Sequence, residues 1–337
     1  WWPLFNGNAT IKEANIVVDK TPPYVAVIAN SYSIAHGGSA LVVVEARDEN
    51  LKDLAITDGA GHRFELFPFV RNHFYAALIA WPIRAQTFRA QVEGVDAAGN
   101  RVAVYIPFFL RSMNYKNSNI TIDDKFLNGK IAELAMNEPK AANLDPVSRF
   151  KYVNETMRQA NEELIYQRAH PKERELISDW SIQPFFPLPN GQVVASFGDH
   201  RFFYYGGQQI SESWHLGIDL ASTQAANVII SNAGKVRFAG YNGIYGNMPL
   251  IDHGLGLASL YGHCTTISVK EGDVVRPGQV IATTGVSGLA LGDHLHFGLT
   301  VQGYEVLPLE WMDARWIKLN VSDVIAQAKI IIAGRPQ

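Results

Sequence analysis

The chain has 337 residues, of which 47% are hydrophobic and 18% are charged, and its formal net charge is -3. This composition supports folded cores rather than disorder, and the length suffices for two or three domains. The small net charge gives no electrostatic basis for a nucleic-acid partner, and none is expected. No stretch approaches the roughly 18 apolar residues of a membrane-spanning helix, and the single cysteine, Cys264, excludes an intramolecular disulfide.

The chain begins with WWPLFNG at Trp1 rather than with a methionine. A removed signal peptide or a membrane anchor upstream of Trp1 would explain this start, and so would a chosen cloning boundary. Residues 1–22 are treated as an N-terminal segment in the expected domain plan. The sequence does not decide the oligomeric state.

Residues 23–110 have the pattern of an all-β domain. Short runs rich in Val, Ile, Phe, Tyr and Ala, among them ALVVVEARD, HFYAALIAW and RVAVYIPFF, alternate with turn signals such as HGGS, DGAG and DAAGN. Strands at this spacing are typical of a sandwich. We therefore expect an immunoglobulin-like β-sandwich over 23–110, serving by default as an interaction module because no motif in it identifies a ligand.

The pattern becomes helical over residues 111–183. Thr121 with Asp124 would cap a helix through KFLNGKIAELAM, and Asp145 before Pro146 is a stronger helix start. Apolar residues then recur at three- and four-residue steps and predict one buried helix face: Val147, Phe150, Val153, Met157, Ala160 and Leu164. Packing against a neighbouring domain explains this face better than a partner helix does. The segment is expected to be a helical linker or subdomain.

From residue 184 the sequence is again rich in strand-like runs and in glycine. Runs such as NVIISNAGKVRFAGY, MPLIDHGLGLASLYGHC and HLHFGLTVQG are joined by tight turns. We expect a β-sheet domain over 184–317 and a C-terminal tail over 318–337. The whole chain is thus predicted to be multidomain and mainly β.

Three short motifs of this domain hold its most informative residues: HLGID (215–219), YGH (261–263) and HLH (294–296). Side chains two or four residues apart share one face of a strand, so His215 can point with Asp219, and His294 with His296. Three strands could therefore direct these groups and His263 at one patch.

Imidazole and carboxylate ligands suit zinc, whose catalytic sites use three protein ligands and leave one position open. The same groups also fit manganese or iron, and the HExxH motif of a common zinc-protease helix is absent from the sequence. Each motif alone is weak, because a lone histidine in a strand is usually structural, but the combination favours a metal site. His253, in IDHG, is interpreted as turn chemistry, and His200, in SFGDHR, as a weak candidate for a direct metal contact or for the rim of the site.

The motifs also occur in the order and at the spacing of a known family. HLGIDL, GKVRFAGYNGIYGNMPLIDHGLGLASLYGH, VKEGDVVRPGQVIATTGVSG and HLHFGL closely resemble the lysostaphin-type (LytM) zinc endopeptidases of bacterial cell walls, over about residues 190–312. The resemblance implies an antiparallel β-sheet domain with one zinc ion at the floor of a groove. It implies peptidoglycan peptides as substrates and an exported protein of the cell envelope, periplasmic or anchored to face the periplasm.

Residue by residue, the resemblance assigns the zinc ligands to His215, Asp219 and His296. It assigns the family's two non-ligand histidines to His263 and His294. Zinc would polarise the scissile carbonyl and lower the pKa of its water to about 7. No glutamate lies in these motifs to act as a base. His263 is therefore expected to take the water proton or hold the water, and His294 to stabilise the tetrahedral intermediate, although the two roles could be reversed.

Some positions depart from the family pattern. Cys264 stands where leucine is common, and it is expected to be a small buried thiol rather than a redox or metal group. Asp293 should point away from the HLH histidines and is not expected to bind metal. The segment that leads to His215, DHRFFYYGGQQISESW (199–214), is long and aromatic. Three of its residues are expected to shape the substrate groove: Tyr204, Tyr205 and Glu212.

Two alternatives to an active endopeptidase stay open. A non-catalytic relative would bind and activate another wall hydrolase, but such relatives typically lack ligands that are all present here. A self-inhibited enzyme would block its own groove, and residues 111–183 are the candidate plug, through an Asn, Asp or His side chain at the open zinc position. The sequence also does not decide which peptide bond is cleaved. The candidates are the D-Ala–diaminopimelate cross-link, another stem-peptide bond and a glycine bridge. The resemblance of GDHLHFG and LEWMDARWI to envelope proteins of Gram-negative bacteria favours the first.

Overall fold

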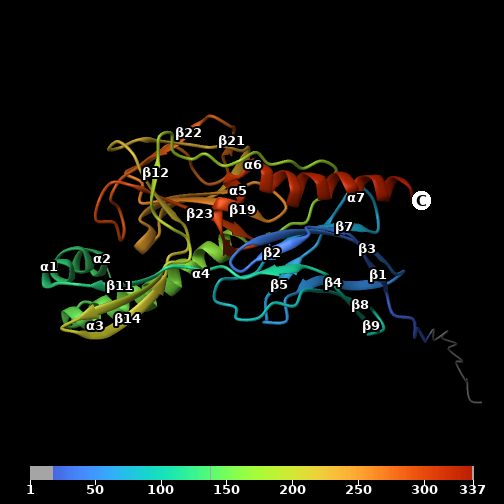
Figure 1. Cartoon of the computed structure of the whole chain (residues 1–337), viewed down its shortest axis with the longest axis horizontal. Coiled ribbons are helices and arrows are strands. Elements are labelled where there is room, and N and C mark those ends of the chain that lie inside the picture. Colours follow the sequence, from blue (N-terminus) through green and yellow to red (C-terminus); the bar gives the residue numbers. More distant parts are fainter. Residues whose placement is uncertain (1–17, 137, 336–337) are drawn as a thin grey trace, which may run out of the picture.

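A computed structural model describes residues 18–136 and 138–335. The strands expected over 23–110 form two antiparallel four-stranded sheets (Figure 1). The first contains, in spatial order, β1 (Tyr24–Asn30), β3 (Ser39–Arg47), β7 (Phe74–Ala80) and β6 (Phe67–Pro68). The second contains β5 (Arg63–Glu65), β4 (Leu51–Thr57), β8 (Gln91–Asp96) and β9 (Arg101–Tyr105). A short parallel pair joins β2 (Ser33–Ala35) to β10 (Phe109–Arg111). The immunoglobulin-like class of this region stays a prediction.

The C-terminal residues are helical rather than a tail. After α5 (Pro308–Met312) and α6 (Ala314–Ile317), a π-helical turn η4 (Lys318–Ser322) leads into α7 (Asp323–Ala333). Helix α7 packs along β1 and β3 (Figure 1) through a stripe of buried residues at helical spacing: Val324, Ile325, Ala328 and Ile332. This cover explains why β3 is buried continuously from Ser39 to Ala46 instead of on alternate residues.

Residues 111–183 begin with a strand and continue as helices. Strand β11 (Asn117–Thr121) precedes α1 (Asp124–Phe126), η1 (Leu127–Ile131), α2 (Ala132–Ala135), α3 (Pro146–Lys151), η2 (Tyr152–Met157) and α4 (Arg158–Ala169). The predicted cap at Asp145 is present, because its side chain accepts from Val147 N and Ser148 N, both at 3.1 Å. The predicted cap at Thr121 is wrong: Thr121 ends β11, and Asp123 caps α1 instead.

The buried face of the long helix departs from its predicted course after Met157. Phe150, Val153 and Met157 are buried as expected, but Ala160 is exposed and Ile165 is buried instead. The π-helical turn η2 lies just before this point. Because a π turn adds a residue to the helical repeat, it shifts the phase of the buried stripe.

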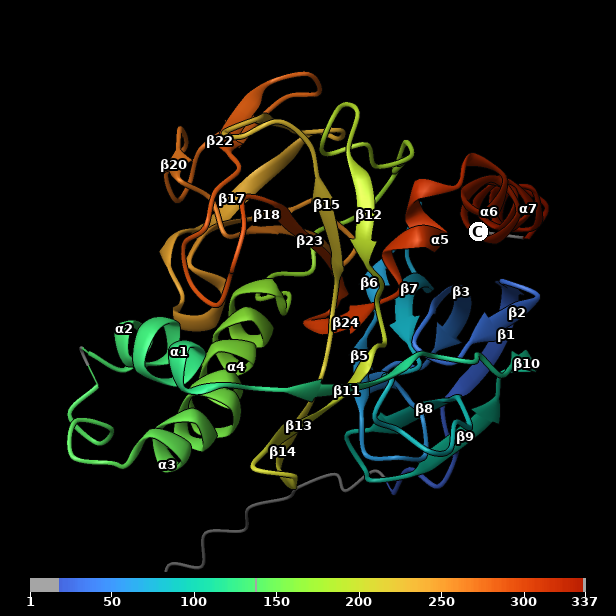
Figure 2. The same ribbon diagram turned by 60° about the vertical axis from the view of Figure 1, so that its left-hand side comes forward.

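An antiparallel sheet forms the centre of the C-terminal half. Its spatial order is β12 (Gln192–Ala195), β15 (Ile218–Ala221), β23 (Leu295–Val301), β19 (Leu257–Gly262), β18 (Asn247–Asp252), β17 (Gly234–Tyr241) and β21 (Val274–Val275), with β24 (Tyr304–Val306) also paired to β23. A smaller sheet contains β16 (Asn227–Ile229), β22 (Val280–Thr283) and β20 (Thr266–Ile267). The hairpin of β13 (His200–Tyr205) and β14 (Gln208–Trp214) belongs to a separate sheet, in which β13 pairs in parallel with β11. The hairpin lies beside α3 (Figure 2).

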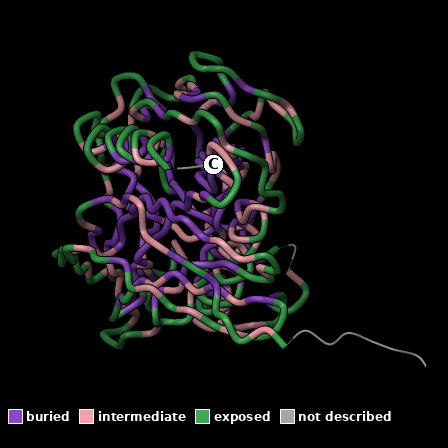
Figure 3. The backbone as a smooth tube through the Cα atoms, turned by 90° about the vertical axis from the view of Figure 1, so that its right-hand side faces the viewer, coloured by how far each residue is buried: buried purple, intermediate pink, exposed green. Residues whose placement is uncertain are grey.

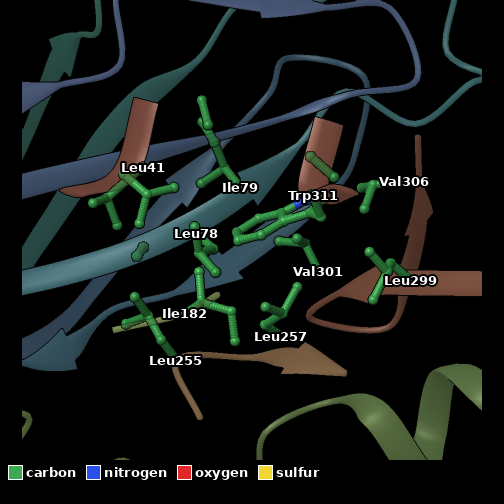
Figure 4. Packing of buried hydrophobic residues seen from close by; sticks show 14 of the residues in the cluster. Leu41, Leu78, Ile79, Ile182, Leu255, Leu257, Leu299, Val301, Val306 and Trp311 are labelled. Atoms are coloured by element: carbon green, nitrogen blue, oxygen red, sulfur yellow. The ribbon is translucent and has the colours of Figure 1, made fainter. Parts of the chain in front are cut away.

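The N-terminal sheets and the C-terminal sheet share one hydrophobic cluster. Buried residues run through the middle of the molecule without a break between the two halves (Figure 3). Leu78 of β7, Val301 of β23 and Trp311 of α5 lie together in this cluster (Figure 4). The indole of Trp311 also donates to Ser39 Oγ at 2.9 Å. Within the described residues, no helix combines the length and the apolar character needed to cross a bilayer.

Candidate metal centre

Three neighbouring strands of the C-terminal sheet bring the predicted site together. Asp219 on β15 is the register partner of His296 on β23, and Gly262, the last residue of β19, pairs with His296 from the other side. His215 precedes β15, and His263 directly follows β19. The tight pairing of these strands therefore gathers residues that are far apart in the sequence.

The three predicted ligands converge on a single point. Asp219 Oδ1 lies 3.0 Å from His215 Nε2 and 2.9 Å from His296 Nδ1, and the two imidazole nitrogens are 3.1 Å apart. Around a tetrahedral zinc ion with bonds of about 2.0–2.2 Å, neighbouring ligand atoms would lie about 3.3–3.5 Å apart. The donor set therefore needs only small adjustments to hold a zinc ion.

The proton positions give a second reason to place a cation here. His215 Nδ1 lies 2.8 Å from the Ser196 carbonyl oxygen, so this nitrogen carries the proton and donates it. In the neutral ring, Nε2 of His215 is then an acceptor that faces the Asp219 carboxylate oxygen at 3.0 Å. Two acceptors repel each other at this distance, whereas a shared metal ion would bind both.

Gly217 is required by the close approach of the His296 ring. A Cβ atom at position 217 would lie 2.6 Å from His296 Nε2 and 2.7 Å from the Phe297 carbonyl oxygen. Neither distance is compatible with van der Waals packing. The glycine in HLGID therefore makes room for the His296 ring, in addition to interrupting any helix.

The two remaining histidines lie next to the ligands. The ring centroids of His263 and His294 are 4.7 Å apart, and His294 Nε2 is 3.7 Å from Asp219 Oδ1. His263 Nδ1 donates to the Ser287 carbonyl at 2.8 Å, and His294 Nδ1 donates to that of Gly292 at 2.7 Å. Each neutral ring thus keeps a lone pair on Nε2. His263 also has a positive φ of 64°, a strained conformation for a residue with a side chain.

Burial and mutual contact set the charge of the cluster. Burial alone would raise the pKa of Asp219, but the close contacts with His215 and His296 outweigh it and hold that pKa far below its usual range. Burial lowers the pKa of His296 to about 4. Burial, followed by the neighbouring imidazoles, lowers the pKa of His263 to about 3. At neutral pH the cluster therefore combines one carboxylate with neutral His263 and His296 rings, the protonation that metal binding needs.

The candidate metal ligands form one wall of a cavity of about 240 Å³. All five predicted histidine and aspartate residues line it, and so do three residues that sequence reasoning missed: Arg158, Arg201 and Tyr245. Tyr245 belongs to a 3-10 turn, η3 (Gly243–Tyr245), and its ring centroid is 5.4 Å from that of His296. Arg158 comes from α4 and Arg201 from β13. No local motif marks them, because they reach the site only through tertiary packing.

The predicted groove residues do not line this cavity. The Tyr205 hydroxyl donates to Asp124 at 2.7 Å, and that of Tyr204 lies 3.5 Å from Gln209. Glu212 lines an adjoining hollow that also includes Arg158. His200, the weak rim candidate, stacks on Trp214 with ring centroids 4.1 Å apart.

Two negative predictions agree with the geometry. Asp293 accepts from Thr284 Oγ1 and Ala225 N, at 2.5 and 3.1 Å, and lies outside the ligand set. Cys264 is fully buried, and burial raises its pKa to about 12, as expected of an inert thiol.

The candidate plug offers no ligand to the metal centre. Of the described residues in 111–136 and 138–183, Arg158 lines the cavity, but no carboxylate, asparagine or histidine does. A guanidinium stays protonated and is not a zinc ligand. Direct ligation of the metal by residues 111–183 therefore finds no support in this arrangement.

Residues 213–308 match Peptidase family M23. The DD-carboxypeptidase/endopeptidase Mpg of Neisseria meningitidis serogroup B is 38% identical over 125 residues, which is 36% of this chain and 27% of that protein. The murein hydrolase activator NlpD of Escherichia coli is 34% identical over 127 residues, which is 37% of this chain and 30% of that protein. The chain thus spans less than a third of the length of these curated relatives.

Among solved structures, the catalytic domain of the antimicrobial peptidase lysostaphin from Staphylococcus simulans is 26% identical, with a TM-score of 0.32. The comparison covers 36% of this chain and 92% of that one. The family match spans the candidate metal ligands and both further histidines. Residues 213–308 are a domain of peptidase family M23, the lysostaphin (LytM) type.

Proposed function

We propose that the protein is a zinc-dependent endopeptidase that cleaves peptide cross-links of bacterial peptidoglycan. The observation that carries this proposal is the convergence of His215, Asp219 and His296 beside the His263–His294 pair in one cavity. An exported location in the cell envelope follows from this substrate. The names of the relatives Mpg and NlpD, an endopeptidase and a murein hydrolase activator, agree with peptidoglycan as the common theme.

The site residues divide into a ligand set and a proton-handling pair. When bound by His215, Asp219 and His296, zinc would polarise the scissile carbonyl and make a water molecule more acidic. His263 is held by its Nδ1–H bond to Ser287 and presents the Nε2 lone pair, which can accept a proton. His294 is held through Nδ1 in the same way and can donate from Nε2 to an oxyanion once it is protonated. The same geometry is compatible with the reverse assignment, in which His294 accepts the proton and His263 stabilises the oxyanion.

A non-catalytic activator is the alternative that the NlpD relationship raises. Loss of a ligand or of one of the two histidines would favour it. The presence of all five residues in one cavity favours hydrolysis instead.

The deciding experiment is digestion of purified, cross-linked peptidoglycan by the zinc-loaded chain, with the products identified by mass spectrometry. A His294→Ala variant with measured zinc content runs beside it, and His200→Ala, outside the cavity, is the matched control. We expect cleavage by the parent and the control, and none by His294→Ala with zinc bound. Absence of cleavage by a parent chain holding one zinc ion would contradict the endopeptidase and favour the activator.

A further inference from the structure

Two arginine side chains from outside the matched family segment face the metal-binding cavity. Arg158 is the first residue of α4, and Arg201 lies on β13, so both precede residues 213–308. Both line the cavity together with Asp219. The chain therefore adds two guanidinium groups to the part of the site that the family match describes.

Hydrogen bonds orient both guanidiniums and leave some of their donors free. Arg158 donates through Nε to the Asn154 carbonyl at 3.1 Å and through Nη2 to Asn154 Oδ1 at 2.9 Å. Asn154 is itself buried and donates to Ser211 Oγ at 2.9 Å. Arg201 donates through Nε to Asp199 at 3.1 Å. Within the described part of the chain, Nη1 of Arg158 and both terminal nitrogens of Arg201 have no hydrogen-bond acceptor.

The charges of the cavity favour an anionic ligand. Its charged lining consists of Arg158, Arg201 and Asp219, so the positive groups outnumber the negative one even before zinc binds. Among the described residues, no carboxylate lies within 4.0 Å of the Arg158 guanidinium. Burial lowers the pKa of Arg158, and the nearby positive charge of Arg201 acts in the same direction. Asp199 neutralises Arg201 from outside the cavity at 3.1 Å, whereas Arg158 has no carboxylate partner among the described residues. A bound anion would neutralise the positive charge that Arg158 presents to the cavity.

We propose that Arg158 and Arg201 form a subsite for a free carboxylate of the peptide substrate, close to the scissile bond. This inference rests on the proposed function. The planar fork of arginine matches a carboxylate with two parallel hydrogen bonds. A cavity of about 240 Å³ is smaller than typical ligand pockets of about 300–1,000 Å³, so it accommodates only a short piece of peptide next to the metal. Peptidoglycan peptides offer such a carboxylate on diaminopimelate or at a chain terminus.

The test compares acid and amide forms of two synthetic peptides, using the zinc-loaded full chain. In the first pair, diaminopimelate follows the scissile D-Ala bond. Its carboxylate next to the acylated amino group is free in one peptide and amidated in the other. In the second pair, a terminal D-Ala follows the bond, and its carboxylate is free or amidated. A charged hydrogen bond corresponds to about tenfold or more in kcat/KM. We therefore expect the acid to exceed its amide by at least about tenfold in one pair, which identifies the source of the carboxylate.

The variants test whether the arginines cause that preference. In Arg158→Gln and Arg201→Gln the acid-to-amide ratio should fall severalfold toward one, whereas Arg158→Lys should retain part of it. Arg168→Gln is the matched control, because Arg168 lies on the same helix but pairs with Glu271 at 2.8 Å outside the cavity. The ratio is measured within one protein sample, so a partly unfolded variant does not distort it.

Failure of the subsite and failure of the proposed function have different signatures. Turnover of acid and amide at equal rates in both pairs would overturn the subsite and leave the endopeptidase intact. Absence of turnover on every peptide and on peptidoglycan would contradict the endopeptidase. In that case the affinities of the same peptides are measured by calorimetry. Tighter binding of the acid than of its amide, lost in Arg158→Gln, supports the subsite. Equal affinities of acid and amide overturn it.

Discussion

Asp219 and His296 lie directly opposite each other on neighbouring strands, with Asp219 Oδ1 2.9 Å from His296 Nδ1. Their separation is fixed by the backbone pairing of β15 and β23 rather than by a loop. His215 is anchored separately, through its Nδ1–H bond to Ser196 at 2.8 Å. Side chains held in this way by a sheet are preorganised, so binding a metal there would need little reordering of the chain.

Replacing the central carboxylate should therefore remove the metal without unfolding the sheet. Asp219→Asn keeps the shape of the side chain but removes its negative charge, and we expect zinc affinity to fall by about a hundredfold or more. Zinc per chain after dialysis against a competing chelator measures the effect. Asp252→Asn, on β18 of the same sheet and paired with Arg237, is the control that should keep its zinc. Full zinc occupancy in Asp219→Asn would rule out the assigned ligand set.

The glycine next to the ligands gives a second prediction. In Gly217→Ala, the new Cβ would meet His296 Nε2 at 2.6 Å, so the ring or the strand must move. We expect a loss of about 1–3 kcal/mol in the free energy of unfolding, as for overpacked cores, together with weaker zinc binding. Gly292→Ala is the matched control, because its Cβ would meet no atom within 4 Å. Equal stability and equal zinc affinity in the two variants would contradict this packing argument.

The sequence predicted the candidate ligands through short motifs with local spacing and through the family resemblance. The two-residue spacing in HLH holds on β23, but His215 lies in the loop between β14 and β15 and still faces Asp219 at 3.0 Å. The cap at Asp145 is local in the same sense. The family resemblance supplied what spacing could not, namely the division of HLH between a metal ligand and a non-ligand histidine.

The cavity wall was not predictable in this way, because it depends on contacts between distant segments. Arg158 reaches the site only after the π-helical turn η2 and the packing of α4 against the sheet set its direction. Tyr205 has the aromatic character of a groove residue, but the parallel pairing of β13 with β11 brings its hydroxyl to Asp124 instead. Neither event leaves a mark in the local pattern of residues.

Helix α4 supports the cavity, which predicts the effect of Asn161→Ala. Asn161 Oδ1 accepts from Ile244 N at 2.9 Å and thereby holds η3, which carries the cavity residue Tyr245. Loss of this bond leaves a backbone N–H unpaired and should cost about 1–2 kcal/mol of stability, with a severalfold fall in peptide cleavage. The exposed Glu163→Ala on the same helix should change stability by less than about 0.5 kcal/mol. A rise in cleavage by Asn161→Ala would instead favour an inhibitory role for residues 111–183.

Glu310 joins the C-terminal half to the N-terminal strands through a buried carboxylate. Its Oε2 accepts from Ser39 N at 3.0 Å, and its Oε1 lies 3.3 Å from Arg111 Nη2. Burial raises the pKa of Glu310 to about 7 from its ordinary 4.5, even though both contacts favour the ionised form. The folded protein therefore keeps this proton to a higher pH than the unfolded chain does.

This difference in pKa predicts how stability depends on pH. Between about pH 4.5 and pH 7 the folded state binds more protons than the unfolded state, so the contribution of Glu310 to stability falls as pH rises. At about 1.4 kcal/mol per pKa unit, the contribution present below pH 4.5 and lost above pH 7 is at most about 3.5 kcal/mol. Glu310→Gln cannot titrate, so its unfolding free energy should fall less over this range than that of the parent. Denaturant unfolding of the metal-free chain at several pH values measures both slopes, with the exposed Glu163→Gln as control. Because every other titrating group is common to the two proteins, parallel slopes in the parent and in Glu310→Gln would refute the assigned shift.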